Sequence, residues 1–128
     1  MSAEAKAAIE VRSLTKRFGR VAAVEGVHLD CAPGEVFGFV GPDGAGKTTI
    51  MRLLAAVMAP DEGSIRIEGL DAVANPELVR SHVSYMPQRF GLYEDLTVDE
   101  NVRFYADLFE IPSALRNSPL WSFCGPLG

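Results

Sequence analysis

The sequence predicts an α/β fold, and three stretches carry this prediction. Residues 9–14, IEVRSL, alternate apolar and polar side chains, as a strand with one covered face does. Residues 35–40, EVFGFV, are apolar almost throughout, which is typical of a strand covered on both faces. A glycine-rich turn follows, and residues 47–58 then place their apolar side chains on one stripe of a helix. A buried strand that leads through a tight turn into an amphipathic helix indicates a layered α/β architecture.

Two further strands are expected to join the first in an N-terminal antiparallel subdomain. Residues 27–31 alternate apolar and polar side chains after a turn at Gly19. Residues 64–69, SIRIEG, alternate again after the break at APDEG. A parallel core sheet then retains only residues 35–40 and 82–88, HVSYMPQ, so this parallel sheet is incomplete. The apolar segment 35–40 is therefore expected to lack part of its cover.

Two helices have recognisable starting residues. Residues 75–80 begin with Asn and Pro, a helix cap followed by a suitable first turn. Thr97 and Glu100 form a capping box, and apolar residues at helical spacing follow until Pro112. Residues 113–128 have no regular period and one charged residue, so an irregular segment is expected there.

Length and composition restrict the class of protein. The 128 residues have room for one domain, and a formal net charge of −5 argues against nucleic-acid binding. The two cysteines match no metal-binding spacing and no disulfide framework, which favours a reducing compartment. No apolar run approaches the roughly 20 residues that a membrane helix needs, and the start lacks a signal peptide's apolar core. The composition favours a cytoplasmic chain.

The glycine-rich turn matches a phosphate-binding loop. Gly41, four further residues and then Gly46, Lys47 and Thr48 fit the pattern G-x-x-x-x-G-K-[ST]. Several backbone N–H groups must point at one anion there, and glycine reaches the required dihedral angles without an obstructing side chain. The following helix adds its N-terminal partial charge. Lys47 would bridge the terminal phosphates and Thr48 would bind Mg²⁺. The alternative is a glycine-rich turn with a solvated lysine.

Together with other segments, this loop makes the chain resemble the N-terminal part of an ATP-binding-cassette (ABC) transporter ATPase subunit. GPDGAGKTT resembles the Walker A loop of this family, and KRFG resembles its A-loop, in which Phe18 takes the position of an aromatic residue that stacks on adenine. APDEGSIRIEG resembles the segment after the Walker helix. VSYMPQRFGLYEDLTVDENVRFYADLFEIP is similar to the Q-loop region, with Gln88 as its glutamine. The last stretch is most similar to ABC-2-type, drug-exporter-like ATPases.

The resemblance implies a P-loop NTPase fold with a partial ABC core, which binds ATP and Mg²⁺. It assigns Lys47 and Gln88 as catalytic residues, and Thr48 and Gln88 as the residues that bind the metal. The residues expected to bind the nucleotide are Phe18, Val24, Gly41, Pro42, Asp43, Gly44, Ala45, Gly46, Lys47, Thr48 and Thr49.

Several of these residues have a simpler interpretation. Phe18 could pack on its own hairpin, and Val24 could belong to the core. Gln88 could be solvated, and Thr49 could cap the helix rather than donate to the α-phosphate. Asp43 stands where the family more often has Asn or Ser, and its negative charge is expected to weaken ATP binding slightly.

The resemblance covers about residues 9–112, so we assign 1–112 to the N-terminal part of a nucleotide-binding domain and 113–128 to a tail outside the family. It implies a permease partner, a second nucleotide-binding domain, a location at the inner face of the membrane, and hydrolysis that drives export. The signature motif, the Walker B strand and the switch histidine do not occur in the sequence. We therefore expect a truncated or frameshifted chain that binds MgATP without turning it over.

Other functions are compatible with the same residues. One is a soluble ABC-superfamily ATPase that acts on nucleic acid or ribosomes, which the net negative charge disfavours. Another is a nucleotide-binding fragment without activity. A GTPase or small-molecule kinase is less favoured, because neither would need the A-loop aromatic residue or the Q-loop.

Overall fold

The computed structural model describes residues 7–89 and 91–116. The chain divides into two units, Met1–Tyr85 and Met86–Gly128, and each is described by itself. Most of the tail predicted to be irregular, residues 117–128, lies outside the described residues.

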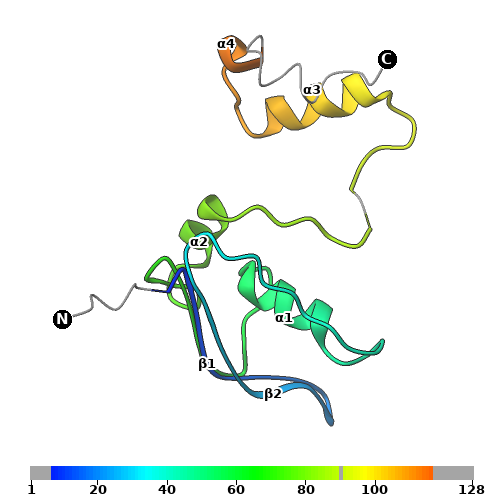
Figure 1. Cartoon of the computed structure of the whole chain (residues 1–128). Coiled ribbons are helices and arrows are strands. Elements are labelled where there is room, and N and C mark those ends of the chain that lie inside the picture. The colour runs from blue at the N-terminus through cyan, green and yellow to red at the C-terminus, as the bar shows by residue number, and fades with distance from the viewer. Residues whose placement is uncertain (1–6, 90, 117–128) are drawn as a thin grey trace, which may run out of the picture. The chain divides into compact units, whose positions relative to one another are not determined.

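The described part of the first unit contains an antiparallel sheet with strand order β2-β1-β3-β4 (Figure 1). Its strands are β1 (Ile9–Phe18), β2 (Val21–Cys31), β3 (Glu62–Ile67) and β4 (Leu70–Asp71). In the register, Val11 of β1 faces Leu29 of β2 on one side and Ile65 of β3 on the other. The predicted antiparallel subdomain, including the pairing of the 64–69 segment with the N-terminal strand, is confirmed. The first two strands are longer than expected, because the hairpin turn comprises only Gly19 and Arg20.

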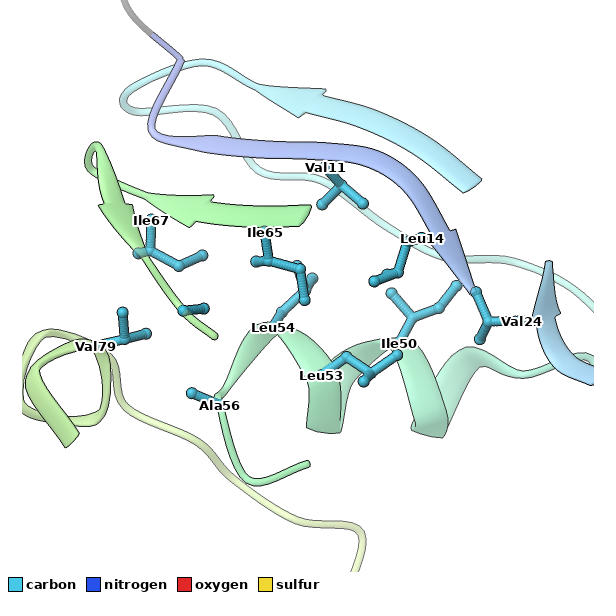
Figure 2. Packing of buried hydrophobic residues seen from close by; sticks show 11 residues of the cluster. Val11, Leu14, Val24, Ile50, Leu53, Leu54, Ala56, Ile65, Ile67 and Val79 are labelled. Atoms are coloured by element: carbon cyan, nitrogen blue, oxygen red, sulfur yellow. The ribbon is translucent and has the colours of Figure 1, made fainter. Parts of the chain in front are cut away.

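Helix α1 (Lys47–Leu54) covers one face of this sheet (Figure 2). The side chains that it buries are Ile50, Leu53 and Leu54, and they meet Leu14 of β1 and Ile65 of β3. Apolar residues at spacings of three and four lie on one side of a helix, so the sequence pattern and the packed face coincide. This packing fixes the N-terminal end of α1 relative to β1 and β2.

Helix α1 is shorter than the predicted helix over 47–58. It ends at Leu54, and Ala56 adopts a left-handed backbone conformation with φ 53°. The Arg80 guanidinium donates to the Ala56 carbonyl at 2.8 Å, which satisfies a carbonyl beyond the helix end. Ala56 itself remains buried, so apolar character continues past the end of the helix.

The two predicted parallel strands are not formed in the described part of the chain. Segment 35–40 has no regular secondary structure, and Val36 and Val40 are 99% and 100% exposed. Segment 83–87 is likewise irregular. The prediction of a strand covered on both faces was wrong, because its apolar pattern requires neighbouring strands that the described residues do not supply. The expectation that the segment lacks cover was correct.

Helix α2 (Pro76–His82) begins after Asn75, as predicted, and extends two residues beyond the expected end at 80. Asn75 makes no side-chain capping bond. The Asp71 carboxylate instead accepts hydrogen bonds from the amides of Val73 and Ala74 at 2.8 and 2.9 Å and turns the chain toward the helix.

The second unit contains helix α3 (Val98–Leu108), and its predicted capping box is confirmed. The Thr97 amide donates to the Glu100 carboxylate at 2.8 Å, and the Glu100 amide donates to the Thr97 hydroxyl at 3.3 Å. Helix α4 (Ser113–Arg116) corrects the expectation of an irregular tail over its first four residues. Arg116 holds this turn in place through an ion pair with Asp107 at 2.6 Å. Across the described residues, no helix is both long and apolar enough to span a membrane.

Candidate functional site

The glycine-rich turn packs closely against β2. Gly44 and Gly46 have left-handed φ angles of 81° and 93°. A Cβ atom on Gly46 would lie 2.2 Å from the Ala23 carbonyl oxygen, so no side chain fits there. The turn can therefore lie this close to β2 only because position 46 is a glycine.

Gly46 is also the N-cap residue of α1, and no side chain caps this end of the helix. The Ile50 amide makes the first hydrogen bond of the helix, to the Gly46 carbonyl at 2.9 Å. The amides of residues 47–49 precede that bond, and the described residues provide no acceptor for them. These unpaired amides, with the positive end of the helix, favour an anion at this position.

The turn and the ends of two strands surround one cavity of about 230 Å³. It is lined by Phe18, Ala23, Asp43, Gly44, Ala45, Gly46, Lys47, Thr48 and Thr49. Phe18 comes from the end of β1 and is 48% exposed. The fold thus places an aromatic ring and a phosphate-binding loop at the same cavity, although they are far apart in the sequence.

Lys47 bends back over the loop that precedes it. Its ammonium group donates to the carbonyl oxygens of Gly41 and Pro42, the latter at 2.9 Å. Gly41 and Pro42 do not line the cavity themselves, but they hold the cation beside it. Both acceptors are neutral, so a phosphate would offer the ammonium a stronger, charge-assisted partner.

Val24 is placed in the core rather than at the cavity. It is buried and packs within the cluster that α1 forms with the sheet, and its neighbour Ala23 lines the cavity instead. Successive residues of a strand point to opposite faces, so a shift of one residue exchanges the two environments. The alternation of β2 places Ala23 and Val24 on opposite faces of the strand. Knowing that Val24 faces the core would therefore have identified Ala23 as the cavity residue.

Gln88 lies in the second unit, outside the cavity-lining set. Its catalytic and metal-binding roles therefore remain predictions from the sequence. Among the described residues, no group of three or more His, Cys, Asp or Glu side chains gathers as a metal site. The exposed Thr48 hydroxyl is the loop's own candidate for a metal ligand, a sparse protein contribution of the kind that Mg²⁺ accepts when phosphates supply further oxygens.

The fold and the cavity define a P-loop nucleotide-binding domain. A model of the ABC transporter family matches residues 24–123, so the chain belongs to that family. The predicted resemblance and fold class are thereby confirmed.

Curated relatives support this assignment. A probable multidrug ABC transporter ATP-binding protein of Escherichia coli (strain K12) is 47% identical over 112 residues, which are 86% of this chain and 19% of that protein. A sulfate/thiosulfate import ATP-binding protein of Bradyrhizobium diazoefficiens is 44% identical over 96 residues, 75% of this chain and 28% of that protein. The chain thus spans about a fifth to a quarter of these relatives.

Solved structures support the same family assignment. The ATP-binding subunit of an ABC transporter superposes with a TM-score of 0.71 at 31% identity, covering 87% of this chain and 47% of that one. A dimeric bacterial ABC transporter cassette, MJ0796, superposes with a TM-score of 0.70 at 25% identity, covering 82% and 49%.

Proposed function

We propose that this chain is the N-terminal part, residues 1–112, of a transporter ATPase, and that it binds MgATP in the cavity at the start of α1. The main observation that supports this proposal is that Phe18 and residues 43–49 line the same cavity. An aromatic face can stack on a base, while glycine amides and a helix start can bind phosphates. One nucleotide presents both chemical groups.

Each side chain has a defined part in this proposal. Lys47 exchanges its two carbonyl partners for phosphate oxygens, and the amides of the first helical turn donate to the same group. Thr48 contributes a hydroxyl ligand to Mg²⁺, and Thr49 donates to the α-phosphate. Mg²⁺, when bound, neutralises phosphate charge and so offsets the carboxylate of Asp43 at the cavity.

Gln88 is proposed to reach the metal or the attacking water from its own segment, as the Q-loop glutamine does in the family. The sequence VSYMPQ supports this position. A glutamine can sense the γ-phosphate because its amide both donates and accepts hydrogen bonds.

The wider proposal concerns partners and location. We propose that the complete protein works with a permease at the inner face of the membrane, pairs with a second nucleotide-binding domain and drives export. The multidrug relative and the dimeric cassette support this proposal. The import relative matches at similar identity, so the case for export depends on the Q-loop region. A soluble ATPase that acts on ribosomes would copurify with RNA rather than with membrane proteins.

The isolated chain is expected to bind ATP without hydrolysing it. Phosphoryl transfer to water needs a group that orients the water, and among the described residues Asp43 is the one carboxylate that lines the cavity. A coupled phosphate-release assay should give the same rate for the parent chain and for Lys47→Ala, which reports contaminating activity. Turnover that depends on Lys47 would contradict this expectation.

Replacing Phe18 by alanine tests the proposed nucleotide pose. Loss of a stacked base costs about 1–3 kcal/mol, so the affinity for MgATP should fall roughly tenfold. The affinity for magnesium tripolyphosphate, which has no base, should remain unchanged. Isothermal titration calorimetry with both ligands measures the difference.

Phe37→Ala is the matched control. Phe37 is 46% exposed, close to Phe18, but it lines a different cavity beside segment 35–40. The Phe37→Ala variant should bind MgATP and magnesium tripolyphosphate as the parent chain does. If Phe18→Ala weakens tripolyphosphate as much as MgATP, the ring does not hold a base and the proposed pose is wrong.

A further inference from the structure

Two cations precede Phe18 in β1, and two acids meet them from a distant loop. Lys16 and Arg17 directly precede Phe18 in the sequence. Asp61 lies just before β3, and Glu62 is the first residue of this strand. The β1–β3 register pairs Thr15 with Glu62, which brings these groups together. The end of β1 is therefore tied to the segment that follows α1.

Asp61 makes most of these contacts. Its carboxylate accepts from the Lys16 ammonium at 3.0 Å and from the Arg17 backbone amide at 2.7 Å. Its own amide donates to the Thr15 carbonyl at 2.9 Å. One residue thus fixes both the backbone and a cationic side chain immediately before Phe18.

This ion pair is better enclosed than the other pair on the same loop. The Lys16 and Asp61 side chains are 16% and 40% exposed, whereas Arg17 and Glu62, which form a 2.8 Å pair, are 45% and 63% exposed. The Arg17 amide and the Lys16 ammonium hold the pKa of Asp61 below its ordinary value, so the carboxylate is charged at neutral pH. Exposed ion pairs contribute little because water and salt screen them, so the less exposed Lys16–Asp61 pair is the stronger of the two.

The restrained cation lies against the ring of Phe18. The Lys16 nitrogen is 5.9 Å from the ring centroid, within the range of a cation–π contact. Phe18 otherwise stands half-exposed at the tip of a hairpin, opposite Val21. We propose that Asp61 is a positioning residue that, through Lys16, holds the Phe18 ring at the cavity for stacking on the nucleobase. This inference rests on the proposed function, because it assumes that Phe18 receives a base.

The test compares Asp61→Asn with Glu62→Gln in the full chain. Both substitutions remove one negative charge from the same loop, but only the first removes the charge that holds Lys16. We expect Asp61→Asn to weaken MgATP about threefold, the size of an exposed cation–π contact, and to leave magnesium tripolyphosphate unchanged. Glu62→Gln should bind both ligands as the parent does. Lys16→Met, which keeps the apolar stem, should reproduce Asp61→Asn.

Two readouts separate positioning from a general structural role. In a double-mutant cycle, Asp61→Asn should have no further effect on MgATP once Phe18 is alanine. In NMR spectra without nucleotide, the ring-current shift of the Lys16 side-chain methylene protons should diminish in Asp61→Asn and persist in Glu62→Gln.

The outcomes differ for the two proposals. Equal weakening of both ligands by Asp61→Asn, additivity in the cycle, or an unchanged MgATP affinity would each overturn the positioning role. If the parent binds neither ligand, the proposed function fails, and the NMR comparison still decides whether Asp61 restrains the ring.

Discussion

Replacing Lys47 by alanine is expected to lower the affinity of the chain for MgATP about a hundredfold, because removing one partner of a close charge pair costs several kcal/mol. The Lys47 ammonium already lies beside the cavity, held by the carbonyls of Gly41 and Pro42. Its loss leaves the triphosphate with backbone donors alone. Calorimetric titration of both chains with MgATP measures the change.

Arg52→Ala is the control for this substitution. Arg52 is also a cation on α1, but it lies in the last turn and does not line the cavity. Both variants lose one positive charge, and both introduce alanine, a good helix former. Arg52→Ala should bind MgATP nearly as the parent does. Equal affinities of the parent and Lys47→Ala would show that the loop does not bind phosphate.

Gly46→Ala is expected to reduce the free energy of unfolding by about 3 kcal/mol or more, since backbone strain and overpacking each cost 1–3 kcal/mol. The added Cβ would lie 2.2 Å from the Ala23 oxygen and 3.3 Å from its carbonyl carbon. Both atoms belong to the backbone of β2, which cannot move aside as a flexible side chain could. Urea unfolding followed by circular dichroism measures the loss.

Gly34→Ala separates the dihedral cost from the steric cost. Gly34 has a φ of 76°, similar to that of Gly46, but a Cβ there would meet open space. The Gly34→Ala variant should lose about 1 kcal/mol of the free energy of unfolding, the cost of a left-handed conformation for a residue with a side chain. Equal losses in the two variants would mean that the loop does not press against β2.

Local rules were enough to predict several features. The phosphate-binding loop follows from the spacing of Gly41, Gly46 and Lys47, because short-range backbone geometry determines its shape. The start of α3 follows from Thr97 and Glu100, whose reciprocal hydrogen bonds span four residues. The antiparallel strands follow from alternation, which depends only on having one covered face.

Some features that depend on distant neighbours were predicted wrongly. Segment 35–40 has the composition of a buried strand, but burial requires partner strands that the described residues lack. Helix α1 ends at Leu54 although the apolar pattern continues: Ala56 adopts a left-handed conformation, and the distant Arg80 donates to its carbonyl. The sequence pointed to Val24 or the core for this position, and the residue that lines the cavity is its neighbour Ala23, one residue away in the strand.

The exposed segment 35–40 has a consequence for synthesis of the protein on the ribosome. Strands β1 to β3 and helix α1 lie within the first 67 residues, so their antiparallel contacts can form as soon as this length has emerged. Chains generally fold from the N-terminus during synthesis, and apolar surface exposed meanwhile promotes aggregation. Val36 and Val40 lie in solvent in the described structure, so this short stretch presents apolar surface at the stage when β1 to β3 and α1 can already pack together.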